Sequence, residues 1–236
     1  MSANPAYLNR AIKKWLLQDT LLTNEDFDLY FSSSNYNGAK LLKLARHNLA
    51  IVINKLEHID LSCVQNFDGL EQLTQLKEVR FFDNKLQELP TPLFALKNLE
   101  KLYIRTNPLL DFEQVCLQLK SFPKLKELYL ENNTLKTVPN NLKHLPHLEH
   151  LRFNNRQFRL QNEIQEIPSF LLTFKQLKAL HFEKNPIQQI PSNLFDFAQQ
   201  QLKEFTLGNY AFNNGLEAKA YLNLFKVHGL KTCQDN

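Results

Sequence analysis

Short stretches in which apolar and polar residues alternate recur along the middle of the chain. Residues 76–81 read LKEVRF, and residues 125–130 read LKELYL. A period of two places every second side chain on the same face of a β-strand, so each stretch predicts a short strand with one buried face. The side chains expected to point into the core are Ile59/Leu61, Val79/Phe81, Leu102/Ile104, Leu128/Leu130, Leu151/Phe153, Leu180/Phe182 and Phe205/Leu207.

These strands belong to a longer unit that repeats. The segments 76–86 and 125–135 both fit the pattern LxxLxLxxNxL, in which the ninth residue is an asparagine that can bond the backbone of neighbouring turns. Successive units start at Leu56, Leu76, Leu99, Leu125, Leu148, Leu177 and Leu202. The ninth position holds Asn84, Asn107, Asn133 and Asn185. A proline that opens a short return segment follows an apolar residue at Leu89-Pro90, Val138-Pro139, Ile167-Pro168 and Ile190-Pro191.

The leucine, asparagine and proline positions recur together from unit to unit. On this basis the region from about Leu56 to Phe212 resembles the leucine-rich-repeat family, in its 23-residue cytoplasmic form with an LxxLP half-repeat. The resemblance implies an α/β solenoid with a curved parallel β-sheet on its concave side. One unit cannot bury its own apolar face, whereas stacked units can. The composition, rich in Asn, Lys and Gln, is also similar to that of stand-alone repeat proteins of AT-rich bacteria.

The chain is expected to divide into a central stack and two caps, because a bare stack would expose its core at both ends. Residues 1–55 do not repeat and are expected to form a helical N-terminal cap. Residues 56–212 supply about seven repeats. Residues 213–236 are expected to form a C-terminal capping helix and tail, since Leu216–Val227 carries an apolar stripe that ends at Gly229.

The unit that starts at Leu148 departs from the pattern. It runs for 29 residues before Leu177, and Arg156 stands in its asparagine column. Residues 154–162 must therefore loop out. Insertions often map to the binding face of a repeat protein, which makes this loop a contact candidate. A tolerated surface insertion is the alternative. The possible loop contacts are Arg156, Phe158 and Arg159.

The strand positions between the buried pairs are expected to face outward on the concave side and to carry the function. In the central units they hold aromatic residues surrounded by arginines, a composition typical of binding hot spots. The expected protein-binding residues are Arg80, Phe82, Tyr103, Arg105, Tyr129, Glu131, Arg152, Asn154 and His181. The alternative is a ladder of side chains that only stack across strands. Seven strands make a sheet roughly 29 Å wide, which about eight or nine extended residues would span.

The charge balance favours a protein or peptide partner over nucleic acid. There are 28 basic and 24 acidic residues, a net charge of +4 spread along the chain. Nucleic-acid binding usually needs a basic stripe on one face. The alternative function is binding of nucleic acid or an anionic surface through Arg80, Lys101, Arg105, Arg152, Arg156 and Arg159. The carboxylates that argue against it are Glu78, Glu127, Glu131 and Glu183.

No catalytic, cofactor or metal site is expected. The 5 glycines form no phosphate-binding motif, and the 3 cysteines include no CxxC pair. Cys63 lacks an evident orienting partner for nucleophilic catalysis. The histidines His144, His147 and His150 are expected on a return segment, a turn and a strand, and so to point apart.

The chain carries no N-terminal signal pattern and no run of about 18 apolar residues. We therefore expect no membrane span. A cytoplasmic protein, monomeric and in a reducing compartment, is the expectation, and secretion by a route that reads no N-terminal signal stays open.

Overall fold

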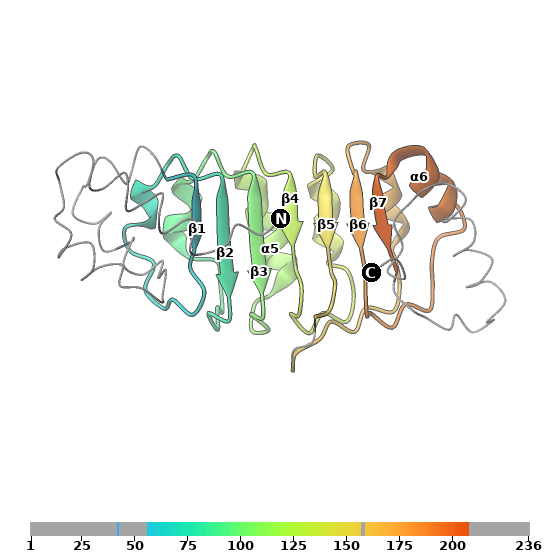
Figure 1. Cartoon of the computed structure of the whole chain (residues 1–236), viewed down its shortest axis with the longest axis horizontal. Coiled ribbons are helices and arrows are strands. Elements are labelled where there is room, and N and C mark those ends of the chain that lie inside the picture. The colour runs from blue at the N-terminus through green and yellow to red at the C-terminus, as the bar shows by residue number, and fades with distance from the viewer. Residues whose placement is uncertain (1–41, 43–55, 157–158, 208–236) are drawn as a thin grey trace, which may run out of the picture.

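The computed structural model describes residues 42, 56–156 and 159–207. In this part of the chain, seven strands form one parallel sheet in chain order (Figure 1). The strands are β1 (His58–Asp60), β2 (Glu78–Phe82), β3 (Lys101–Arg105), β4 (Glu127–Tyr129), β5 (His150–Arg152), β6 (Ala179–His181) and β7 (Glu204–Thr206). Each repeat thus contributes one strand, which confirms the solenoid. The caps predicted over 1–55 and 213–236 lie outside the described residues, except that Leu42 is helical and buried.

Short helices form the return side and lie behind the sheet in Figure 1. They are η1 (Leu70–Gln72), η2 (Thr91–Ala95), α5 (Phe112–Gln118), η3 (Leu119–Ser121), η4 (Asn140–His144), η5 (Ser169–Thr173) and α6 (Leu194–Gln201). Pro90, Pro139 and Pro168 each stand directly before a 3-10 helix, as the proline column predicts. The unit that starts at Leu99 lacks that proline and carries α5, where the Asp111 side chain accepts hydrogen bonds from the first backbone N–H groups.

The core lies between the sheet and the return helices. All the predicted inward side chains are buried there except Leu207, which is only partly buried. Adjacent strands pair in the same register, so that Val79 lies beside Leu102. Like positions of neighbouring units therefore contact one another, and the rings of Phe153 and Phe182 stack with centroids 5.0 Å apart.

The chain leaves most strands through a tight turn. The eighth residue of the unit has positive φ at Cys63, Asp83, Thr106, Asn132 and Lys184. This left-handed conformation turns the backbone sharply out of the strand. The next residue, the ninth, then points inward, which places its amide beneath the turn of the neighbouring unit.

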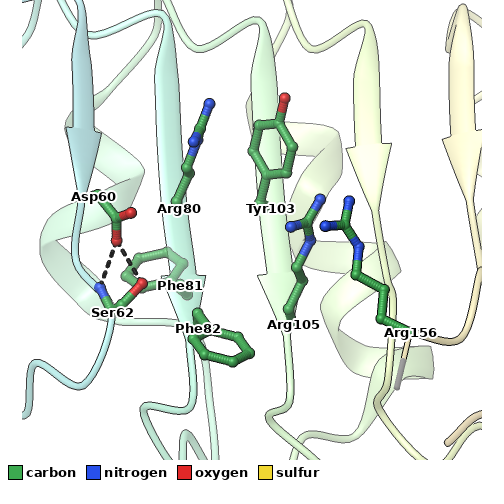
Figure 2. A pocket seen from close by; sticks show the side chains of 8 residues that line it. All are labelled: Asp60, Ser62, Arg80, Phe81, Phe82, Tyr103, Arg105 and Arg156. Carbon is green, nitrogen blue, oxygen red and sulfur yellow. Dashed lines mark hydrogen bonds between the residues drawn. The ribbon is translucent and has the colours of Figure 1, made fainter. Parts of the chain in front are cut away.

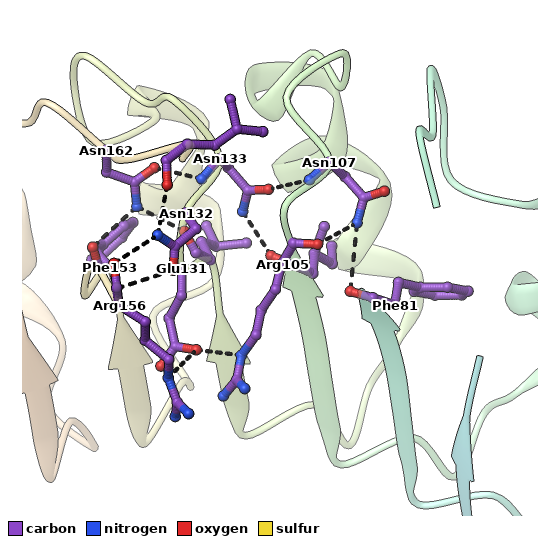
Figure 3. Close-up of polar contacts among 12 residues, drawn as sticks. Phe81, Arg105, Asn107, Glu131, Asn132, Asn133, Phe153, Arg156 and Asn162 are labelled. Carbon is purple, nitrogen blue, oxygen red and sulfur yellow. Dashed lines mark hydrogen bonds and ion pairs between the residues drawn. The ribbon is translucent and has the colours of Figure 1, made fainter. Parts of the chain in front are cut away.

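The inward amides form a continuous ladder, as the asparagine column predicts. The Asn107 Oδ1 accepts from the backbone N–H groups of Asn84 and Leu86 in the preceding unit, at 3.1 and 3.3 Å. The Asn133 Oδ1 accepts from the Asn107 N–H at 2.8 Å, and its Nδ2 donates to the Ile104 carbonyl at 2.6 Å (Figure 3). Each asparagine therefore satisfies backbone groups that the turns would otherwise bury unpaired.

The assignment of Arg156 to the asparagine column was wrong. Asn162 occupies the ladder instead, because its Oδ1 accepts from the Asn133 N–H at 2.9 Å. The extra residues therefore stand between the strand and the ladder asparagine, over 156–161. Asn155 joins the two ends of this insertion: its Oδ1 accepts from the Asn162 N–H at 2.6 Å, and its Nδ2 donates to the Asn162 carbonyl at 2.7 Å.

Candidate binding face

The side of the sheet turned away from the helices, here called the concave face, carries a stacked pair of tyrosines at its centre. The rings of Tyr103 and Tyr129 lie nearly parallel, 7° apart, with centroids 4.0 Å apart, because the two residues pair directly across β3 and β4. The Tyr129 hydroxyl donates to the Glu127 carboxylate at 2.5 Å. Burial, reinforced by this hydrogen bond, raises the pKa of Tyr129.

Several predicted contact residues lie on this face but are not exposed, so that part of the prediction was wrong. Only 6% of Tyr129 is exposed, because Tyr103 covers one side of it and Arg152 lies 5.3 Å from its ring centroid. The other predicted contacts that prove buried are Glu131, Asn154 and His181. In-register strands bring like positions together, so side chains cover their neighbours. The stacking alternative therefore describes this part of the face.

Buried polar residues of the face are paired along the sheet. The Asn154 Oδ1 accepts from the Glu183 N–H at 3.0 Å. The His181 Nδ1 lies 2.9 Å from the Thr206 hydroxyl. These bonds join successive strands, and both side chains are buried within the face. The predicted contacts that remain partly exposed are Arg80, Phe82, Tyr103, Arg105 and Arg152.

Two arginines stand over Tyr103. The Arg80 guanidinium carbon is 4.9 Å from its ring centroid, and that of Arg105 is 5.1 Å away. Such cation–π contacts hold the guanidinium groups in place at the surface. Arg80 also forms a 2.5 Å ion pair with Glu78. Although burial raises the pKa of Glu78, the hydrogen bond from His58 and the charge of Arg80 together lower it.

A pocket opens between these side chains (Figure 2). Its volume is about 200 Å³, and its lining residues are Asp60, Ser62, Arg80, Phe81, Phe82, Tyr103, Arg105 and Arg156. It thus brings together predicted strand contacts and a predicted loop contact. Asp60 and Ser62 were not among the predicted contacts, although they occupy the same outward positions in the first unit. Asp60 accepts hydrogen bonds from the Ser62 backbone N–H at 2.9 Å and from its hydroxyl at 2.5 Å.

A buried carboxylate supports one wall of the pocket. Glu131 is 1% exposed and forms ion pairs with Arg105 and, at 3.6 Å, with Arg156 (Figure 3). Burial lowers the pKa of Arg105. The charge of Glu131 raises this pKa, whereas the charges of Arg156 and Arg80 lower it further. Positive charge therefore converges at this wall.

His181 is expected to make the protein less stable in acid. Burial, followed by the charge of Arg152, lowers its pKa in the folded protein to about 4, although Glu204 and Glu183 oppose the shift. An unfolded histidine titrates near 6.5. The unfolded chain therefore binds more protons between these values, so this contribution is complete above about pH 6.5 and is lost as the pH falls toward 4.

The measurement is urea unfolding at pH 7 and pH 5. The unmodified chain should lose more free energy of unfolding between the two than His181→Gln does. The half-exposed His150, on the adjacent strand, gives a control: His150→Gln should keep the dependence of the unmodified chain. Equal losses in His181→Gln and the unmodified chain would rule out His181 as the source.

Other candidate groups fall outside the pocket. In the ranges 56–156 and 159–207, no three His, Cys, Asp or Glu residues come close enough to hold a metal ion. Burial raises the pKa of the Cys116 thiol to about 12, the opposite of what a nucleophilic cysteine requires. Arg159 is exposed and does not line the pocket. Phe158 lies outside the described residues. No helix in the described part has the length and apolar character that a membrane crossing requires.

The repeats match a known family. Residues 97–157 fit the family model described as leucine rich repeat. The match falls on units whose strands, asparagine ladder and return helices have the arrangement described above. Residues 97–157 are therefore leucine-rich repeats, and the parallel sheet continues through the units on either side of them.

Curated relatives share only part of their length with this chain. The volume-regulated anion channel subunit LRRC8E of Xenopus laevis is 30% identical over 114 residues, which are 48% of this chain and 13% of that protein. The adenylate cyclase of Schizosaccharomyces pombe is 26% identical over 155 residues, 61% of this chain and 9% of that protein. The similarity thus covers a small fraction of either relative.

Similar structures are repeat proteins of bacteria. An internalin of Listeria monocytogenes has a TM-score of 0.48 and 19% identity, with 78% of this chain and 49% of that chain covered. A leucine-rich-repeat protein of Leptospira interrogans has a TM-score of 0.49 and 20% identity, with 77% and 49% covered.

Proposed function

We propose that this chain is a non-catalytic protein-binding module that engages an extended peptide segment through the concave face, centred on β2 and β3. The observation that carries the proposal is the pocket, in which Phe82 and Tyr103 lie among three arginines. The few residues that dominate the binding energy at protein interfaces are enriched in tryptophan, tyrosine and arginine. The leucine-rich-repeat fold is commonly a protein-interaction module, which agrees with this use of the face.

The pairing of charges favours a protein partner over nucleic acid. The arginines and the lysine of the strands on this face each have a carboxylate partner: Arg80 pairs with Glu78, Lys101 with Glu127, Arg105 with Glu131, and Arg152 with Glu204. A surface that binds phosphates needs unpaired positive charge, which releases counterions on binding. The face instead offers nearly balanced charge with aromatic surface between the pairs. We therefore favour a peptide that presents both apolar and polar side chains.

The character of the pocket also supports a binding role rather than catalysis. No histidine or cysteine lines it, so it lacks the usual general base and the usual thiol nucleophile. Its volume of about 200 Å³ is below the ~300 Å³ of small ligand sites. It is large enough for one side chain of a partner.

The experiment that tests the proposal is a selection of random peptides about nine residues long, displayed on phage, on the full chain. Selected peptides should bind in fluorescence anisotropy, and the double variant Tyr103→Ala/Arg105→Ala should weaken them by about tenfold or more. Tyr129 is left unchanged because it is buried. The control is Leu117→Ala, an exposed apolar residue of α5 on the other side of the sheet.

Two results would contradict the proposal. One is a selection that yields no peptide, and the other is equal binding by the double variant and the unmodified chain, with circular dichroism showing both folded. A steep fall of affinity with salt, together with tighter binding of a single-stranded oligonucleotide than of any selected peptide, would favour the nucleic-acid alternative.

A further inference from the structure

We propose that the pocket between β1 and β3 is a specificity site for one acidic side chain of the bound peptide, whose carboxylate is held between Arg105 and Arg156. This inference rests on the proposed function. It adds the chemistry that the peptide must carry and assigns a role to the insertion of the fifth unit.

The first support is the geometry of the two guanidinium groups. Figure 2 shows Arg105, from β3, and Arg156, from the insertion, side by side with their guanidinium groups directed into the same region beside Tyr103. Both share one buried carboxylate, that of Glu131. Two positive charges against one negative charge leave one unit of positive charge at this wall. An incoming carboxylate would balance it.

The second support concerns which anion fits. Arg80, the third arginine, is already neutralised by Glu78 at 2.5 Å. Asp60 lies on the opposite wall and repels excess negative charge. A carboxylate carries a single charge, whereas a phosphate monoester carries about −1.5 to −2 at neutral pH. The single positive charge left at the wall of Arg105 and Arg156 therefore matches an aspartate or glutamate better than a phosphorylated residue, and the charge of Asp60 across the pocket further disfavours a dianion.

The size of the pocket agrees with a single side chain. An apolar cavity of about 150 Å³ accommodates benzene, and this pocket measures about 200 Å³. Phe81 is among its lining residues, but the ring of Phe81 is fully buried in the core, so the rings that the pocket offers to a ligand are those of Phe82 and Tyr103. The methylene groups of an acidic side chain can pack on these rings while the carboxylate accepts hydrogen bonds from the guanidinium groups. Guanidinium–carboxylate bonds of this kind are charge-assisted and directional.

The third support is the way in which the insertion is fixed. The Arg156 backbone N–H donates to the Asn132 Oδ1 at 3.1 Å, and the Asn132 Nδ2 donates to the Leu160 carbonyl at 2.6 Å. Asn132 thus holds both sides of the insertion against the turn after β4. A unit of 23 residues would have the ladder asparagine directly after Asn155 and would place no side chain here. The insertion therefore supplies the second guanidinium group of the carboxylate site, that of Arg156.

The test compares peptides that differ only in charge. Peptides selected on the full chain should contain one fixed Asp or Glu, and replacing that residue with the matching amide should weaken binding by about tenfold or more. Arg156→Gln should lower the affinity for the acidic peptide and remove its advantage over the amide peptide. Arg156 is exposed and outside the ladder, so this variant should unfold at the same urea concentration as the unmodified chain. Lys143→Gln, an exposed residue of η4, removes the same charge on the other side of the sheet and should preserve the difference.

The outcomes separate this inference from the proposed function. Peptides that bind and depend on Tyr103 but contain no fixed acidic residue would overturn the carboxylate site and leave the peptide-binding face standing. Equal affinity of the acidic and amide peptides would likewise overturn the carboxylate site without contradicting the peptide-binding face. A phosphoserine at the acidic position that binds more tightly than glutamate would also overturn the inference, because the site would then prefer a dianion.

Discussion

Asn162→Leu is expected to lower the free energy of unfolding by about 3 to 9 kcal/mol. The Asn162 side chain accepts from the Asn133 and Leu135 N–H groups, at 2.9 and 3.0 Å, and donates to the Leu130 and Phe153 carbonyls, at 2.9 and 3.0 Å. The Phe153 carbonyl has a second donor. Leucine has a similar size but offers no polar atoms, so three buried backbone groups would lose this partner. Each such loss costs roughly 1–3 kcal/mol.

Urea unfolding of the full chain, followed by circular dichroism, measures this effect. Gln161→Leu, at the exposed neighbouring position, is the control and should change the stability by less than about 0.5 kcal/mol. A loss below about 1 kcal/mol for Asn162→Leu would show that this residue does not carry the ladder through the fifth unit.

Phe153→Ala is the second substitution expected to have a large effect, a loss of about 3–5 kcal/mol. The ring is fully buried and stacks on Phe182, with centroids 5.0 Å apart and planes 12° apart. Removing it leaves a cavity between two units that the parallel register prevents from closing freely. The loss also includes an aromatic contact worth about 0.5–1.5 kcal/mol.

The matched control is Phe82→Ala, on the other face of the sheet. Phe82 occupies the seventh position of its unit, one residue beyond the inward position that Phe153 holds in its own, and is partly exposed. Its removal should cost no more than about 1 kcal/mol. The pair is compared by thermal and urea unfolding. Similar losses for the two variants would contradict the assignment of the sheet faces.

The sequence was sufficient to predict the stack and its core. Alternation in residues 76–81 and its recurrence at unit spacing determine which side chains of each strand point inward, since the period of a strand is two. The asparagine column follows from the same count. Residues far apart in the chain could be placed because each unit contacts mainly its neighbours.

To find the ladder asparagine of the fifth unit in the sequence, one has to count backward from the proline that follows it. Counting forward from Leu148 places Arg156 in the asparagine column, whereas counting back from Ile167-Pro168 places Asn162 there. The second count is the correct one, because the amide hydrogen bonds to Asn133 require it. The signal was therefore present in the sequence, in the intact stretch that follows the insertion.

The burial of residues on the concave face could not be read from periodicity. The pattern assigns Tyr129 and Glu131 to the correct side of the sheet, but it carries no information about which neighbours cover them. Strands about 4.8 Å apart bring matching positions into contact, so an aromatic ring or a carboxylate in one unit is covered by what stands in the next. Exposure depends on the identity of these neighbours, here Tyr103 and Arg105.

The pair of hydrogen bonds between Asn155 and Asn162 has an evolutionary and practical consequence. Because the two ends of the intervening segment are tied to each other, its length and composition can change while the stack on either side keeps its spacing. Substitutions in this segment can therefore change binding specificity during evolution without lowering the stability of the stack. The same property makes this position suitable for grafting a fluorophore site or a foreign loop into the repeat array.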